Sequence, residues 1–197
     1  MIPMNPKFAV LLLCASLLPA VQARAKDKII LPDACGDDSA TFEVKAEEGQ
    51  PAPTPPPEGK AQIVFIETMS KNDGCHGCDQ TRQTTRFGVD GAWVGANRSN
   101  SYFAMNVDPG VHHMCVQDQS RVKKFRADIA LDSFTAEPGT VYYYEINLDL
   151  LLMDMASGPG RSSGSKGGNP GFVLSQLGED DGKYRVKAWK LATWKTK

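Results

Sequence analysis

The chain has 197 residues, with 22 Lys and Arg against 23 Asp and Glu and a formal net charge of −1. This near-neutral balance argues against nucleic-acid binding, which needs a concentrated basic face. The densest basic stretch, residues 121–126, is typical of a solvated loop between strands. The length fits one domain with additional segments.

The first 23 residues have the organisation of a secretory signal peptide. Lys7 supplies the positive start, residues 8–18 are apolar, and Val21-Gln22-Ala23 places small residues where signal peptidase reads them. We expect cleavage after Ala23 or after Ala25. The apolar run is shorter than the roughly 18 residues of a membrane span, and Cys14 follows a leucine where a lipid-attachment site has a small residue. The sequence therefore predicts an exported protein without a transmembrane span after cleavage.

Cysteine usage agrees with export. The chain has five cysteines, and the loss of Cys14 with the signal peptide leaves four. An even number in an exported chain is typical of disulfides, and four cysteines allow three pairings. We favour Cys75 with Cys78, which flank a short Gly-containing loop, and Cys35 with Cys115. The second bond would tie the N-terminal segment to a central strand and stabilise the fold by roughly 4 kcal/mol.

Residues 24–60 are predicted to form an N-terminal segment with one strand over residues 41–45. A linker follows over residues 49–59, where five prolines exclude helix and remove ladder donors. The folded domain is expected over residues 61–197. Its first strand, residues 61–67, is apolar on both faces, which indicates a central position in a sheet.

Tight-turn sequences then separate short runs of Val, Tyr, Phe and Ile. Asp90-Gly91, Asp108-Pro109-Gly110 and Glu137-Pro138-Gly139 each lie between two such runs. We predict three antiparallel hairpins. They pair residues 84–89 with 92–96, 102–107 with 111–117, and 127–134 with 141–148.

The C-terminal part is less regular. Residues 158–171 are rich in Gly and Ser and predict a disordered loop. A last strand is expected over residues 172–177. Glu179-Asp180-Asp181 favours the start of a helix that runs to Trp189, although residues 184, 186 and 188 also alternate as in a strand. The fold class is therefore mainly β, an antiparallel β-sandwich of about seven or eight strands with a short C-terminal helix.

Several short motifs between residues 61 and 148 are shared with a known family. They are residues 61–66, Val89-Asp90-Gly91, Gly95, Ser101-Tyr102-Phe103, Pro109-Gly110-Val111-His112, Ala136-Glu137-Pro138-Gly139 and Val141-Tyr142-Tyr143. In these residues the chain resembles the DUF2846 domains of bacterial envelope proteins. The resemblance implies a β-sandwich similar to PEGA-like and transthyretin-like modules and brings no catalytic residues. Members of the family are often lipoproteins, and this chain differs from them because it lacks a lipid-attachment motif at Cys14.

Metal binding or thiol redox chemistry is the alternative to disulfides. Cys75 and Cys78, with His113 and Cys115, have the ligand types that Zn²⁺ prefers, and His113 and Cys115 share one face of a strand. Asp79 after the second cysteine excludes covalent haem attachment, and the βαβ context of thioredoxin is missing. Because export favours oxidation, we expect no metal or other cofactor.

Three aromatic residues are candidates for a binding surface: Tyr143, Trp93 and Tyr102. Alternation along the strand places Tyr143 on the face opposite Tyr142 and Tyr144. Neither a G-x-S-x-G nor an H-E-x-x-H motif is present, so we expect no enzyme. The predicted function is a non-enzymatic binding or structural module, periplasmic or associated with the cell envelope, whose partner is an envelope protein or glycan.

Overall fold

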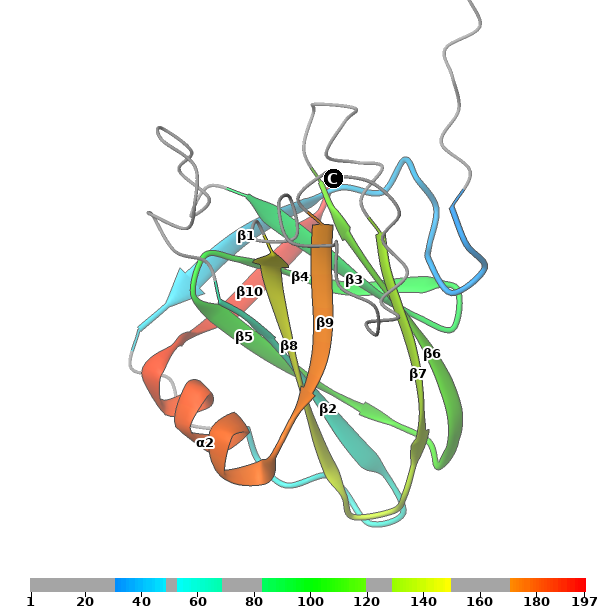
Figure 1. Cartoon of the computed structure of the whole chain (residues 1–197), viewed down its shortest axis with the longest axis vertical. Coiled ribbons are helices and arrows are strands. Elements are labelled where there is room, and N and C mark those ends of the chain that lie inside the picture. Colours follow the sequence, from blue (N-terminus) through cyan, green and yellow to red (C-terminus); the bar gives the residue numbers. More distant parts are fainter. Residues whose placement is uncertain (1–30, 49–52, 69–82, 120–128, 150–170) are drawn as a thin grey trace, which may run out of the picture.

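The computed structural model describes residues 31–48, 53–68, 83–119, 129–149 and 171–197. These residues form ten strands and one helix, which Figure 1 labels. The elements are β1 (Phe42–Glu47), β2 (Ala61–Glu67), β3 (Thr84–Val89), β4 (Ala92–Arg98), β5 (Ser101–Val107), β6 (Gly110–Asp118), β7 (Ile129–Ala136), β8 (Val141–Asp149), β9 (Gly171–Leu177), α2 (Glu179–Ala188) and β10 (Lys190–Thr196). The predicted signal peptide, the Cys75–Cys78 pair, the basic stretch at 121–126 and most of the Gly/Ser loop lie outside the described residues.

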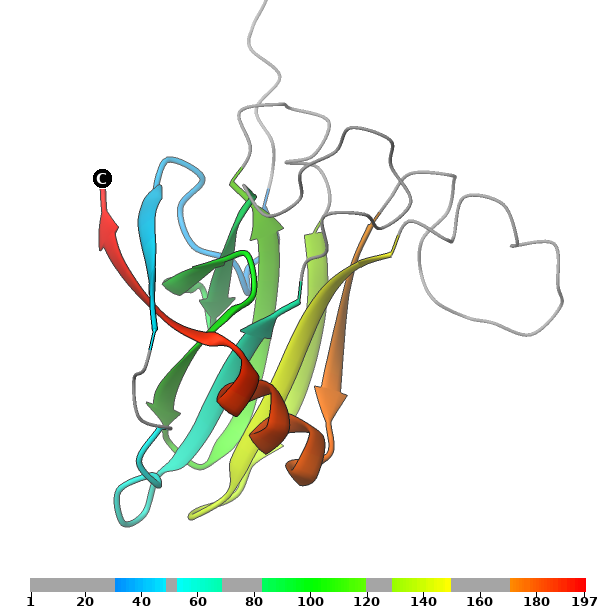
Figure 2. The same ribbon diagram turned by 90° about the vertical axis from the view of Figure 1, so that its left-hand side faces the viewer.

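The strands form two sheets that face each other (Figures 1 and 2). The larger sheet has the order β1-β10-β5-β2-β8-β9, and the smaller has the order β4-β3-β6-β7. The mainly β architecture agrees with the prediction, and most pairings are antiparallel. The larger sheet is mixed, however, because β2 pairs with β8 and β10 pairs with β5 in parallel.

An aromatic cluster joins the two sheets. Phe65 on β2 lies 4.8 Å from Phe87 on β3 and 5.2 Å from Phe103 on β5, measured between ring centroids. Each of the three side chains is at most 1% exposed. Strand alternation directs them to one side of their sheets, so burial of their apolar area holds the layers together.

Only one of the three predicted hairpins forms. Asp90 (φ +50°) and Gly91 (φ +85°) make a two-residue turn with positive φ at both positions, and β3 pairs with β4 across it. By contrast, the two Pro-Gly turns join strands of different sheets: β5 to β6, and β7 to β8. The prediction that these strands pair was wrong, because a turn sequence shows where the chain reverses but not which neighbour a strand then meets.

The two ends of the chain build one edge of the larger sheet. The predicted N-terminal strand is β1, and it pairs antiparallel along its whole length with β10. The sequence did not predict β10, and β9, expected as the last strand, is followed by α2 and β10. The strand β1, which precedes residue 61, is thus part of the sheet. None of the helical structure described is long and apolar enough to cross a membrane.

The helix α2 agrees with the prediction from its acidic first turn, with Glu179, Asp180 and Asp181 at its start and Arg185 and Lys187 in its last turn. It lies over the outer face of the larger sheet (Figure 2). There a second apolar cluster forms, and its buried members are Val64, Ile66, Tyr102, Tyr143 and Val186. This second layer explains why β2 is buried on both faces.

Gly182 lets the helix approach the sheet. A Cβ atom at this position would lie 2.1 Å from Cγ of Tyr143, well inside van der Waals contact. Gly182→Ala is expected to lower the free energy of unfolding by about 1–2 kcal/mol, because overpacking outweighs the higher helix propensity of alanine. Urea denaturation measures the change. Gly178→Ala is the control, since a Cβ there meets nothing within 4 Å. A Gly182→Ala protein more stable than the wild type would contradict this packing.

Candidate functional site

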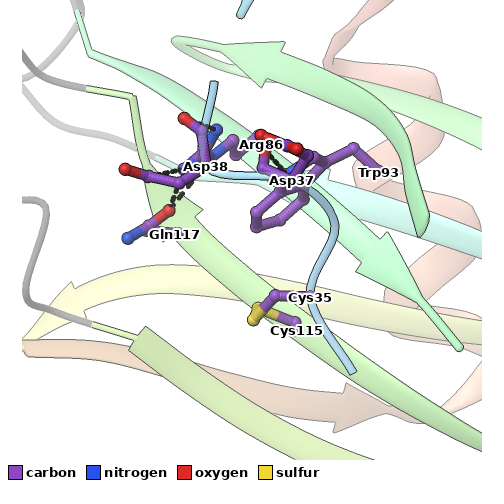
Figure 3. The surroundings of a disulfide bond; sticks show 7 residues. All are labelled: Cys35, Asp37, Asp38, Arg86, Trp93, Cys115 and Gln117. Carbon is purple, nitrogen blue, oxygen red and sulfur yellow. Dashed lines mark hydrogen bonds and ion pairs between the residues drawn. A yellow bond between two sulfur atoms is a disulfide. The ribbon is translucent and has the colours of Figure 1, made fainter. Parts of the chain in front are cut away.

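The predicted bond between Cys35 and Cys115 is confirmed (Figure 3). The two residues, 80 positions apart in sequence, form a disulfide with their Cα atoms 5.1 Å apart. Cys115 lies on β6, on the outer face of the smaller sheet, and Cys35 lies in the segment of residues 31–40, here called the N-terminal strap. The bond therefore closes the strap over this face. The second predicted pair, Cys75 with Cys78, lies outside the described residues.

A buried arginine holds the strap beside the disulfide (Figure 3). Arg86 on β3 is 1% exposed. Its Nη1 donates to the carbonyl of Ala40 at 2.6 Å, its Nη2 meets the carboxylate of Asp38 at 2.9 Å, and its Nε donates to Oε1 of Gln117 at 3.0 Å. One guanidinium thus joins the strap to both β3 and β6, with its donors used in the fork geometry that only arginine offers.

Trp93, predicted as a binding residue, packs against the same strap. The guanidinium carbon of Arg86 lies 4.2 Å from its ring centroid, and its indole N–H donates to the carbonyl of Asp37 at 2.8 Å. A Cβ at Gly36 would lie 2.4 Å from Cδ1 of the same ring. The ring is therefore engaged by the protein itself, and it stabilises the strap.

The metal-binding alternative loses one of its four ligands. Cys115 is bonded to Cys35, so its sulfur is not a thiolate. His113 is exposed, and Cys75 and Cys78 lie outside the described residues. Within the described ranges, no group of three or more His, Cys, Asp and Glu side chains is arranged to hold a metal ion.

The His112 ring has two hydrogen-bond partners, whereas His113 is exposed. The Nδ1 of His112 lies 2.6 Å from the Asp90 carboxylate and its Nε2 lies 2.7 Å from the Asp108 carbonyl. Both partners only accept hydrogen bonds, so the geometry suits the doubly protonated ring. Burial lowers the pKa of His112, but these two bonds and the Asp90 charge outweigh it, and the pKa is raised. The ion pair ties the β3–β4 turn to the β5–β6 corner.

A buried carboxyl group lies at the opposite end of the sheets. Glu67, the last residue of β2, is 0% exposed, and neither of its carboxyl oxygens hydrogen-bonds a described residue in normal geometry. Burial raises the pKa of Glu67 well above its ordinary value, and the Asp118 carboxylate adds to the rise. Thr85, the Ser99 amide and Arg98 act in the opposite direction but do not cancel it. Burial therefore favours the protonated, uncharged form of Glu67 in the folded protein.

The remaining two aromatic candidates are covered. Tyr102 is 1% exposed and Tyr143 is 8% exposed, because α2 lies over both of them. Tyr143 does lie on the face opposite Tyr142 and Tyr144, as predicted, but that face is an interior. Trp93 belongs to the other sheet. The three residues thus form no common aromatic surface.

Covering this face leaves a groove beside the helix. A pocket of about 570 Å³ lies between residues 53–56, here called the proline segment, the start of β8 and α2. Its lining consists of Pro53, Pro55, Pro56, Gln62, Gly139, Thr140, Val141, Tyr143, Glu179, Lys183, Val186 and Lys187. This volume is typical of sites for small organic ligands. Among the described residues, the groove is the candidate site.

Tyr143 connects the groove to the interior. Its ring packs under Gly182, and its hydroxyl, which faces the groove, hydrogen-bonds no described residue. Burial raises the pKa of Tyr143, and the charges of Lys183 and Glu179 both act on this hydroxyl. The hydroxyl is therefore a protonated donor beside charged side chains.

Sequence analysis missed most of this site. One signal was present: Glu179, Lys183 and Lys187 recur every fourth residue and so share one face of a helix. That spacing marks a charged helix face but not what it borders. The proline segment, taken as a linker, forms the facing wall, more than a hundred residues away in sequence.

Arg86→Lys tests the strap. We expect a loss of about 2–4 kcal/mol in the free energy of unfolding, since one ammonium cannot serve Asp38, Ala40 and Gln117 together and leaves buried acceptors unpaired. Urea denaturation of the oxidised protein measures it. Arg98→Lys, at an exposed position of β4, is the control. Equal losses in the two variants would contradict the role of Arg86.

Glu67 predicts the direction of the pH dependence. An unfolded glutamate titrates near 4.5, and a raised folded pKa means that the native state holds its proton longer. Stability is then highest below pH 4.5 and falls as the pH rises towards the folded pKa. Glu67→Gln should remove this fall and so make the protein more stable than the wild type at pH 7. Urea denaturation from pH 4 to pH 8 measures both, and parallel curves for the two proteins would refute the assignment.

Comparisons with protein-family models, with curated proteins and with solved structures found no match to this chain. Two structural features of the chain bear on its function: the strap closed by the Cys35–Cys115 disulfide, and the groove beside α2.

Proposed function

We propose that this protein is an exported, non-enzymatic binding module of the cell envelope. The groove between the proline segment, β8 and α2 carries the proposal, because it combines the volume of a ligand site with an apolar floor and a few polar groups. Its partner is a component of the envelope, met in the periplasm or at the membrane surface.

The disulfide supports export. Cys35–Cys115 fastens the strap across the smaller sheet, and Cys115 is 0% exposed. Structural disulfides persist in oxidising compartments and are rare in the cytosol. The signal-peptide pattern of residues 1–23 and the resemblance of residues 61–148 to DUF2846 domains point to the same compartment, and membership of that family is part of the proposal.

The chemistry of the groove favours binding over catalysis. Its described lining includes no His, Ser or Cys that would serve as a base or nucleophile. The amide of Gln62 already donates to the carbonyl of Thr54 at 2.9 Å and to Asn106. The wall is thus held in place by its own hydrogen bonds, as suits a preformed site.

Filling the groove tests the proposal. Val141 lies on its floor, half-buried, so Val141→Trp should occupy the space and weaken retention on envelope material by about tenfold or more, the equivalent of 1.4 kcal/mol. The mature, oxidised protein is incubated with isolated peptidoglycan and, separately, with inner- and outer-membrane vesicles, and the bound fraction is measured.

Thr135→Trp is the matched control, since Thr135 is exposed on β7 of the other sheet. It should bind like the wild type. Thermal denaturation checks that both variants are folded. Equal retention of Val141→Trp and the wild type would exclude the groove, and a cytoplasmic protein with reducible, unpaired Cys35 and Cys115 would exclude export.

A further inference from the structure

We propose that the groove beside α2 binds a small organic anion with an apolar, planar body. The inference rests on the proposed function and names the class of ligand. Three features of the groove carry it: an apolar lining, a lysine that forms no ion pair with a described residue, and a tyrosine hydroxyl that forms no hydrogen bond with one.

The apolar surface comes from both sides of the groove. Pro53, Pro55 and Pro56 line the groove together with Val141, Val186 and Tyr143, and the last three pack against one another. Proline rings and a tyrosine edge offer flat, rigid contact areas, which lose little conformational entropy when a ligand covers them. A planar hydrocarbon or aromatic body fits such walls better than a flexible polar chain.

The charge at the groove favours an anion. Three charged side chains line it: Glu179, Lys183 and Lys187. Lys183 and Glu179 form an ion pair one helical turn apart, so their charges largely cancel. Lys187, one turn further along, makes no ion pair with a described residue, and its positive charge remains. An acidic group of a ligand would complete it, and a cationic ligand would be repelled.

The hydroxyl of Tyr143 is a hydrogen-bond donor that can orient the acidic group of a ligand. Its side chain is 8% exposed, yet no described residue accepts its proton. Because burial raises its pKa, the group stays protonated and can donate to a carboxylate or sulfonate oxygen. In the proposed complex, Lys187 and Tyr143, which both line the groove, are available to the acidic group of the ligand, while the prolines and valines contact its apolar body.

Two related dyes separate the contribution of the ligand's charge from that of its apolar body. The first, 8-anilinonaphthalene-1-sulfonate, has an aromatic body and one anionic group, and the second, N-phenyl-1-naphthylamine, has the same body without the charge. Both are titrated against the mature, oxidised protein and followed by fluorescence. We expect the sulfonate to bind saturably at one site. Lys187→Met should weaken it about fivefold and leave the neutral dye unchanged.

Tyr143→Phe keeps the ring under Gly182 and should also weaken only the sulfonate, by about threefold to tenfold. Lys195→Met on β10, which does not line the groove, is the control and should bind like the wild type. A second control removes exposed apolar side chains elsewhere: Val111→Ser with Leu131→Ser on the smaller sheet. This pair should leave both titrations unchanged.

Other results would overturn the inference. If Lys187→Met does not change sulfonate binding, or the Val111/Leu131 pair abolishes it, the groove is not an anion site. If Val141→Trp abolishes the binding of both dyes but neither Lys187→Met nor Tyr143→Phe weakens the sulfonate, the proposed binding function stands while the anion assignment fails. If neither dye responds to Val141→Trp and envelope retention does not either, both fail.

Discussion

The contact between Gly182 and the Tyr143 ring decides what the outer face of the larger sheet becomes. Without a Cβ at residue 182, α2 lies directly on the ring. Because the helix lies so close, it covers the outer face of the larger sheet. Val64 and Ile66 of β2 and the Tyr143 ring are therefore buried in a second apolar layer. The same contact places α2 beside Tyr143 and Val141 of β8, which line the groove.

The smaller sheet is covered by a different device. Among the described elements no helix lies over the strap face of this sheet, which is covered by the strap of residues 31–40. Instead, a disulfide, a buried guanidinium and an indole each fix one point of the strap, at Cys115, Arg86 and Trp93. Because the guanidinium is buried, its ion pair with Asp38 and its hydrogen bonds to Ala40 and Gln117 are needed together: losing one acceptor leaves charge or donors unpaired in a low-dielectric site. Covalent and polar contacts here do the work that hydrophobic packing does under α2.

Sequence reasoning succeeded where the signal is local. The positive-φ turn at Asp90-Gly91, the doubly apolar strand β2 and the acid-led start of α2 each depend on neighbouring residues, and each was predicted. The pairing of Cys35 with Cys115 was also predicted, by assigning the close pair first. Local signals failed at the two Pro-Gly turns, because there the chain crosses from one sheet to the other and the two strands joined by the turn do not pair. They failed again at β10, whose pairing with β1 spans nearly the whole described chain.

Prediction of Tyr102 and Tyr143 as surface residues failed because alternation tells which face a side chain is on, not whether something covers that face.

The sequence alone determined that this chain is mainly β and where its tight turn lies, since backbone dihedral preferences and side-chain alternation act over a few residues. It also favoured the pairing of Cys35 with Cys115 among three alternatives, and the structure confirms that pairing. Only the tertiary structure decided which strands share a sheet, that Glu67 is enclosed without a hydrogen-bonding partner among the described residues, and that three prolines face Lys183 and Lys187 across a groove. Those outcomes arise from packing between segments far apart in the chain. The free energy of such packing depends on how whole surfaces fit, and no short stretch of sequence encodes that fit.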